Sequence, residues 1–264
     1  MSERRLMVMG GGNMGAALVG GLLAAGWATP GELAVVEVVG GRRAELADLF
    51  PDVEMVAEAV PAAAALIAVK PGDVPAAVTS AVAAGARRIL SIAAGVRVDV
   101  LEAAAGVSVA VVRAMPNTPA LVGQGAAAIC GGSSATDADL DWAASILESV
   151  GTVVRVPESQ LDAVTGLAGS GPAYLFLVAE ALTEAGVLAG LARPVAEALV
   201  RQLLVGSAAL LAERGDAAAL RAMVTSPGGT TAAGLRALED RAIRAAFIDA
   251  VMAATLRSRE LGGS

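Results

Sequence analysis

The stretch "LMVMGGGNMG", residues 6–15, decides the fold of the N-terminal half of the chain. It begins with four apolar residues, a run of strand length, and continues through a glycine cluster into a run with helical character. Gly10, Gly12 and Gly15 have the spacing Gly-x-Gly-x-x-Gly. Between a strand and a helix, these glycines permit a tight turn, close approach of a pyrophosphate and close helix–strand packing, in that order. We therefore predict a dinucleotide site here, with the diphosphate on the helix N-terminus; the alternative is a structural turn.

Further apolar runs of strand length follow, and helical runs separate them. Near-continuous apolar strands that alternate with helices are typical of a parallel sheet covered on both faces. The expected strands are "ELAVVEVVGG" (32–41), "ALIAVK" (65–70), "RRILS" (87–91), "VSVAVVRAM" (107–115) and "TVVRVPE" (152–158).

The pattern changes after Pro157, where the strand signal ends. The helical runs that follow span residues 172–188, 194–214, 217–224, 231–239 and 241–259. We predict an α/β fold with a Rossmann-like dinucleotide-binding domain at residues 1–157 and an all-α domain at residues 158–264. The run "PVAEALVRQLLVGSAALL" (194–211) is apolar around most of its circumference, so we expect a core or another subunit to cover it.

Composition narrows the possible functions. The chain has 264 residues, is 56% hydrophobic and has a mean hydropathy of +0.67. Residues 6–31 carry no charge, but their glycines, Asn13 and Pro30 argue against a signal peptide or spanning helix, so we expect a soluble protein without a membrane partner. A net charge of −7 without a basic patch disfavours nucleic acid. Because Cys130 is the single cysteine, we predict no internal disulfide and a reducing, cytoplasmic setting.

The chain has no histidine and only one lysine, Lys70. Histidine-dependent acid–base catalysis and histidine metal sites are thereby excluded, and we expect no metal site. Lys70 ends an apolar strand in "AVKPG" (68–72), where ligands bind in open α/β sheets. It is either a site residue or an ordinary surface lysine. "SIAAGV" (91–96) and "MPNTP" (115–119) end later strands and belong to the same rim.

Glu37 stands 22 residues beyond Gly15, near the end of the second strand. An acid at this point can accept hydrogen bonds from the adenosine ribose hydroxyls of NAD, or it is a solvated carboxylate. Arg42 and Arg43 follow and are able instead to hold a 2′-phosphate. Both NADPH and NADH therefore remain candidates for the cofactor.

Six segments occur in the order and spacing of the pyrroline-5-carboxylate reductases, and the chain resembles this family over nearly its whole length. The most diagnostic parts are residues 162–174 and 226–231. The segments are "GGGNMG" (10–15), "AVKP" (68–71), "SIAAGV" (91–96), "VRAMPNTP" (112–119), "ESQLDAVTGLAGSGPAY" (158–174) and "TSPGGTT" (225–231). The resemblance implies an oxidoreductase that reduces 1-pyrroline-5-carboxylate to L-proline with NAD(P)H, the last step of proline biosynthesis.

The resemblance also implies how the parts are used. The helical domain would form a homodimer that assembles into a larger ring, a decamer. The cofactor would rest on Met9, Gly10, Gly11, Gly12, Asn13, Met14, Gly15, Glu37, Ala68, Val69, Lys70, Pro71, Ala93 and Ala94. The imino acid substrate would be held by Glu158 and, from the neighbouring subunit, by Ser226, Gly228, Gly229, Thr230 and Thr231. Thr231 would reach the ring nitrogen as the catalytic residue. The chain departs from the family at two positions: around Met55 the family often has an Asn near the adenosine, and near Met223 some members have an Asn at the substrate side.

The absence of histidine agrees with reduction of an imine. Reducing a ketone creates an alkoxide and requires a general acid, whereas a protonated cyclic imine already carries its proton and becomes a neutral amine. Orientation and electrostatics then suffice. Two alternatives remain: a 3-hydroxyacid dehydrogenase with Lys70 as the acid, although the helical domain lacks the lysine typical of those enzymes, and a non-catalytic NAD(P)-sensing protein.

Overall fold

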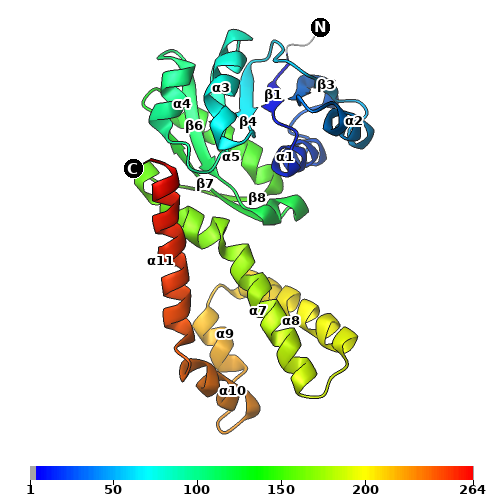
Figure 1. The fold of residues 1–264 in the computed structure, drawn as a ribbon, viewed down its shortest axis with the longest axis vertical. Helices are drawn as coiled ribbons and strands as arrows, with labels where there is room; N and C mark the ends of the chain where they lie inside the picture. Colours follow the sequence, from blue (N-terminus) through cyan, green and yellow to red (C-terminus); the bar gives the residue numbers. More distant parts are fainter. Residues whose placement is uncertain (1–3, 264) are drawn as a thin grey trace. The chain divides into compact units, whose positions relative to one another are not determined.

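The computed structural model describes residues 4–263 (Figure 1). The chain divides into two compact units. The sheet unit comprises the chain up to Ser170 together with the residues from Met252 on, and the helical unit comprises Gly171–Val251. The last strand ends at Arg155, and no other strand follows it within the described residues. The predicted boundary at residue 157 stays a prediction.

The sheet unit is built on one eight-stranded sheet in the order β3-β2-β1-β4-β5-β6-β7-β8. Its strands are β1 (Leu6–Met9), β2 (Leu33–Val36), β3 (Glu54–Val56), β4 (Ala64–Ile67), β5 (Arg88–Ser91), β6 (Ala110–Met115), β7 (Gly125–Gly131) and β8 (Gly151–Arg155). This confirms the predicted Rossmann-like α/β fold.

The expectation of a wholly parallel sheet was wrong at one pair. Strand β7 runs antiparallel to β6, and the sequence pattern missed both β7 and the short β3. Between β6 and β7 the chain makes only a 3₁₀ turn, η3 (Thr118–Val122), and then reverses at Gly123, whose φ is +70°. Glycine adopts this left-handed conformation without a steric penalty, so the next strand returns beside β6 without a crossover helix.

Both faces of the sheet are buried, because alternate residues of each strand enter different cores. On β1, Leu6 and Val8 pack with α1 (Asn13–Ala24) and α5 (Asp137–Leu147). Met7 and Met9 pack on the other side with α3 (Val74–Ala83) and α4 (Val98–Ala105). The remaining elements of this unit are α2 (Gly40–Leu49), α6 (Leu161–Val164), the 3₁₀ helices η1 (Pro30–Glu32), η2 (Pro71–Asp73), η4 (Glu148–Val150) and η5 (Glu158–Gln160), and a π-helical turn, η6 (Thr165–Gly169).

The strand order reverses between β1 and β4, which are hydrogen-bonded neighbours. In open α/β sheets, ligands bind outside the carboxyl ends of the strands at such a switch point. The loop after β1 and the first residues of α1 carry Gly10–Gly15, and the loop after β4 carries Ala68–Lys70. The topology therefore brings two of the predicted cofactor segments to one crevice.

The helical unit consists of helices joined by short loops. They are α7 (Gly171–Leu188), α8 (Arg193–Arg214), α9 (Ala217–Met223), α10 (Thr230–Glu239) and the first part of α11 (Ile243–Leu261). Pro194 lies in the first turn of α8, where its missing N–H costs nothing, and Gly215 ends the helix at a φ of +75°. The Asp216 side chain caps α9 by accepting hydrogen bonds from the backbone N–H groups of Ala218 and Ala219.

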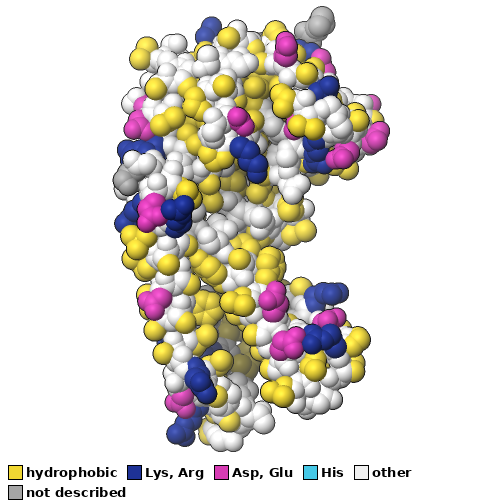
Figure 2. All heavy atoms as spheres, viewed as in Figure 1, with side chains coloured by type: hydrophobic (Ala, Val, Ile, Leu, Met, Phe, Trp, Pro, Cys, Tyr) yellow, Lys and Arg dark blue, Asp and Glu magenta, His cyan; other side chains and the backbone are white. Residues whose placement is uncertain are grey.

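Many apolar side chains of the helical unit are exposed on the single chain, and hydrophobic side chains are visible over its surface (Figure 2). Phe176 of α7 is 64% exposed and Leu203 of α8 is 54% exposed. By length and composition alone, Glu158–Leu188 and Arg193–Arg214 could cross a membrane, and only 11% and 6% of their most apolar windows are buried. Such helices must be covered by another apolar surface.

Candidate cofactor cavity and substrate loop

The glycine loop after β1 is shaped by close backbone contacts. Gly10 has a φ of +105°, and a Cβ there would lie 2.7 Å from the Ala68 carbonyl oxygen. A Cβ on Gly15 would lie 2.2 Å from the Gly10 carbonyl oxygen. Both positions therefore require glycine. Gly12 differs, because no heavy atom of the described residues lies within 4 Å of where its Cβ would stand.

The open space at Gly12 belongs to a cavity of about 1260 Å³ at the switch point. Gly12 is the N-cap of α1, which has no acidic residue in its first turn and no side-chain cap among the described residues. The first backbone N–H groups of a helix lack partners within the helix and carry a partial positive charge. A helix N-terminus with empty space at its glycine cap fits a dinucleotide pyrophosphate.

Twelve of the fourteen predicted cofactor residues line this cavity: Met9, Gly10, Gly12, Asn13, Met14, Glu37, Ala68, Val69, Lys70, Pro71, Ala93 and Ala94. Gly11 and Gly15 lie outside the lining. Sequence reasoning missed others, including Val38, Val39, Ala57, Glu58, Ala59 and Asp73. Three of these residues, Ala57, Glu58 and Ala59, directly follow β3. Because the sequence pattern did not predict β3, it could not place the residues at its end in the site.

Glu37 is held against the glycine loop by backbone donors. Its Oε2 accepts the Gly11 N–H at 3.0 Å, and its Oε1 accepts the Val39 N–H at 2.9 Å. A Cβ on Gly11 would meet Leu46 Cδ1 at 2.2 Å, so Gly11 is needed for packing under α2. The Arg42 Nε–H donates to the Gly11 carbonyl at 2.8 Å. Glu37 and Arg42 thus hold Gly11 in place through its N–H and its carbonyl oxygen.

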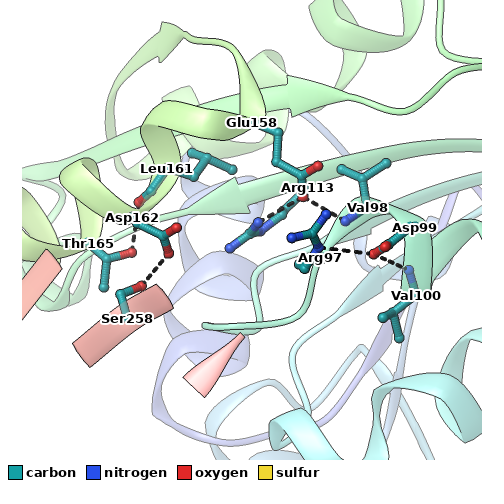
Figure 3. Close-up of polar contacts among 10 residues, drawn as sticks. All are labelled: Arg97, Val98, Asp99, Val100, Arg113, Glu158, Leu161, Asp162, Thr165 and Ser258. Carbon is teal, nitrogen blue, oxygen red and sulfur yellow. Dashed lines mark hydrogen bonds and ion pairs between the residues drawn. The ribbon is translucent and has the colours of Figure 1, made fainter. Parts of the chain in front are cut away.

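Glu158 connects three elements of the sheet unit (Figure 3). Its Oε1 accepts hydrogen bonds from the backbone N–H of Val98, at the start of α4, at 2.7 Å and from the Arg113 guanidinium on β6 at 2.8 Å. The Arg113 side chain is 7% exposed and that of Glu158 is 33% exposed. Burial, and then the charge of Glu158, raise the pKa of the neighbouring Cys130 thiol to about 11. Glu158 also lines a polar cavity of about 250 Å³, together with Arg97, Arg113, Ser159, Asp162 and Gly262.

A second cavity, of about 540 Å³, adjoins the cofactor cavity, because Pro71 and Ala94 line both. Its polar lining comes from Thr165 and Ser170 at the π-helical turn and from Arg257 and Ser258 on α11. The Ser258 hydroxyl donates to Asp162 Oδ1 at 2.6 Å, and the Thr165 hydroxyl donates to the Leu161 carbonyl (Figure 3). Sequence reasoning assigned none of these side chains individually, although three lie within the diagnostic segment 162–174.

The predicted substrate loop lies in the helical unit. Gly228 has a φ of +70°, and a Cβ on Gly229 would meet the Ser226 Oγ at 2.4 Å. Gly229 is the N-cap of α10, and the described side chains leave this N-terminus uncapped and without an acid in the first turn. Thr230 is exposed and Thr231 half-buried. The loop therefore offers bare N–H groups and hydroxyls, as an anion requires.

Lys70, Met55 and Met223, which the sequence also singled out, lie in different surroundings. Lys70 is exposed and caps η2 at the cavity. Met55 lies on β3 and packs on the core, whereas Met223, the last residue of α9, is 59% exposed. Among residues 4–263, no cluster of three or more His, Cys, Asp or Glu residues could hold a metal ion.

Proteins of known family match this chain from end to end. A protein named pyrroline-5-carboxylate reductase from Mycobacterium leprae is 42% identical over 98% of this chain and 97% of its own length. One of the same name from Synechocystis is 42% identical over 98% of both chains. The chain belongs to the pyrroline-5-carboxylate reductase family. A family model described as pyrroline-5-carboxylate reductase dimerisation matches residues 158–261.

Solved structures of the family agree with the fold. A pyrroline-5-carboxylate reductase from Coxiella burnetii has a TM-score of 0.91 and 33% identity, and the alignment covers 98% of this chain and 99% of that one. A pyrroline carboxylate reductase from Plasmodium falciparum with NADP bound has a TM-score of 0.85 and 29% identity over 99% of both chains. A second family model, described as NADP oxidoreductase coenzyme F420-dependent, matches residues 5–95, which include the glycine loop.

Proposed function

We propose that the protein is an NAD(P)H-dependent oxidoreductase that reduces 1-pyrroline-5-carboxylate to L-proline, the last step of proline biosynthesis. The observation that carries this function is the full-length similarity, at about 40% identity, to reductases of that name. The cavity at Gly12 supports this function, because its lining fits a dinucleotide. The second cavity lies next to it, since Pro71 and Ala94 line both.

The chain's own residues would hold the cofactor along the switch point. The N-terminus of α1 would take the pyrophosphate, Glu37 the adenosine ribose, and the loops at Ala68–Pro71 and Ala93–Ala94 the nicotinamide half. The cofactor supplies a hydride to the imine carbon. The protein orients the two reactants and excludes water, which is the contribution of a site without a general acid.

The substrate is held by groups that recognise a carboxylate and a ring nitrogen. The uncapped N-terminus of α10, with Ser226, Gly228, Gly229 and Thr230 before it, would bind the carboxylate. The Thr231 hydroxyl would bond the ring nitrogen and keep the imine carbon facing the cofactor. Glu158 would contribute its second carboxylate oxygen from the polar cavity. The proton on the imine stays on the product amine, so the absence of histidine is no obstacle.

The protein works as a homo-oligomer on a small-molecule imino acid. A second copy of the dimerisation domain would cover the apolar surfaces of α7 and α8 that the single chain exposes. The substrate loop would then serve the cofactor cavity of the neighbouring subunit, and dimers would assemble into a decameric ring. The protein is soluble, because that assembly buries its apolar helices, and we place it in the cytoplasm on the ground of its single cysteine and its reaction.

Cofactor oxidation with a panel of substrates tests this function. The purified protein should oxidise NADH or NADPH when 1-pyrroline-5-carboxylate is supplied, and much more slowly with 2-keto or 3-hydroxy acids. Equal or faster turnover of a hydroxy or keto acid would favour the hydroxyacid dehydrogenase. Cofactor binding without turnover of any substrate would favour the sensor.

A further inference from the structure

We propose that Glu37 makes this enzyme prefer NADH to NADPH, and that the two arginines beside Glu37 do not compensate for its charge. The inference shares with the proposed function only the cavity in which the cofactor binds. Because the Plasmodium relative is described with NADP bound, family membership alone leaves the preference open. The side chains of this chain at the ends of β2 and β3 decide it.

Glu37 follows β2, and its backbone N–H donates to the Val56 carbonyl at the end of β3. It lines the cofactor cavity. In this fold an acid after the second strand accepts hydrogen bonds from the ribose hydroxyls of the adenosine half. A 2′-phosphate would bring additional negative charge to the same place.

The Glu37 carboxylate is held in one position by backbone donors. Its two oxygens accept hydrogen bonds from the N–H groups of Gly11 and Val39, and the Gly11 N–H belongs to the glycine loop itself. Swinging the carboxylate away from a phosphate would leave the Gly11 N–H without its acceptor and loosen the loop. Each carboxylate oxygen still has a free lone pair for a ribose hydroxyl. The carboxylate can therefore accept hydrogen bonds from the ribose diol, but it cannot move away from a 2′-phosphate without losing its own hydrogen bonds.

The 2′-phosphate of NADPH would need a cation beside it, and two arginines follow Glu37 in the sequence. The Arg43 guanidinium donates to the Glu37 carbonyl at 2.7 Å, and Arg42 donates to the Gly11 carbonyl and to Glu45. Neither arginine lines the cavity. A second acid, Glu58, lines it near the end of β3, whereas the lysine of the lining, Lys70, follows β4. At the adenosine end the cavity thus presents carboxylates, while both guanidinium groups are held on backbone carbonyls.

Binding measured without an imino acid tests the proposal separately from the proposed reaction. Calorimetric titration of the wild-type protein with NADH and NADPH, and with ADP-ribose and its 2′-phosphate, should show at least about tenfold weaker binding of each 2′-phosphorylated ligand. Glu37→Ser should reduce that ratio about tenfold or more, chiefly by improving binding of the phosphorylated ligands. These affinities do not depend on imine reduction, so they test the cofactor preference even if the proposed reaction proves wrong.

Two further variants keep the result interpretable. Glu37→Gln removes the charge but retains the size and one acceptor for the loop, so it separates charge repulsion from loop damage. Asp48→Asn removes the same charge from α2 at a residue outside the cavity lining, and the ligand ratio should not change. Equal or tighter binding of NADPH by the wild type would overturn the proposal. So would an unchanged ratio in both Glu37 variants, or an equal shift in Asp48→Asn.

Discussion

At the scale of single residues, the three glycines of the Gly-x-Gly-x-x-Gly motif have different structural roles. Gly10 and Gly15 lie against backbone atoms, so their replacement strains the fold. A side chain at Gly12 meets only the cavity. The same three-glycine pattern therefore contains two structural positions and one at which substitution affects the ligand alone.

Gly12→Val should abolish cofactor binding while the protein remains folded, because the new side chain would occupy the pyrophosphate's place. Fluorescence titration with NADH would measure the loss, and thermal unfolding would show the fold intact. Gly15→Ala is the matched contrast. Its Cβ would overlap the Gly10 carbonyl, and we expect a loss of about 1–3 kcal/mol in the free energy of unfolding. Unchanged cofactor affinity in Gly12→Val would show that the glycine motif forms a structural turn and does not bind the pyrophosphate.

Thr231 should matter more for catalysis than Thr230, although the two hydroxyls are adjacent at the start of α10. A hydrogen bond to a charged group is worth roughly 1.5–3 kcal/mol. Thr231→Val should therefore lower kcat/KM about 10- to 100-fold, less than the loss of an indispensable general acid. Thr230→Val should cost little. Steady-state kinetics of both variants, with a check of assembly, measures this; equal losses would indicate general damage to the loop.

At the scale of elements, Glu158 joins β6 to the N-terminus of α4 and is also the predicted substrate residue of the sheet unit. Both duties are compatible, because one carboxylate oxygen holds both structural hydrogen bonds. The buried Arg113 guanidinium depends on that oxygen. A purely catalytic residue would leave the fold unchanged when removed.

Glu158→Ala should therefore lower the free energy of unfolding by about 1–3 kcal/mol, because it leaves buried Arg113 donors without their partner. The pKa of Cys130 should fall at the same time, since the Glu158 charge contributes to raising it. The pH dependence of thiol alkylation would report that fall. In the wild-type fold the raised pKa keeps the thiol protonated up to about pH 11, so alkylation at neutral pH should require unfolding. A loss of stability with no change in the pKa of Cys130 would show that the Glu158 charge does not act on the thiol.

At the scale of the whole molecule, the helical unit is incomplete as a single chain. Many apolar side chains of α7 and α8 are exposed. The proposed substrate loop belongs to this unit, and the proposed cofactor cavity belongs to the other. Activity should therefore depend on assembly.

Leu203→Glu in α8 should produce monomers and abolish imine reduction, because it places a charge in the proposed subunit interface. Cofactor binding should persist, since the cavity lies within the sheet unit. Sedimentation velocity and kinetics would measure both effects. Glu213→Gln, an exposed change near the end of the same helix, is the control and should assemble normally. A fully active monomer would contradict the proposal.

The sequence by itself determined the Rossmann-like fold and the helical half. Periodicity and glycine spacing are local properties, so the five long helical runs after Pro157 were predicted within a few residues. Twelve of the fourteen predicted cofactor residues line the cavity at the switch point. Family resemblance added the proposed substrate loop, which leads into the N-terminus of α10, where no described side chain caps the helix.

Only the tertiary structure decided the rest, because it depends on contacts between residues far apart in the chain. Strand β3 has only three residues, and β7 consists mostly of Gly and Ala, which have low β-propensity, so neither shows a clear strand pattern. Both become strands through pairing with their neighbours. The link from Glu37 to Gly11 spans 26 residues and that from Glu158 to Val98 spans 60. No local pattern encodes which donor a carboxylate will meet. That choice is made when the strand ends converge on one edge of the sheet.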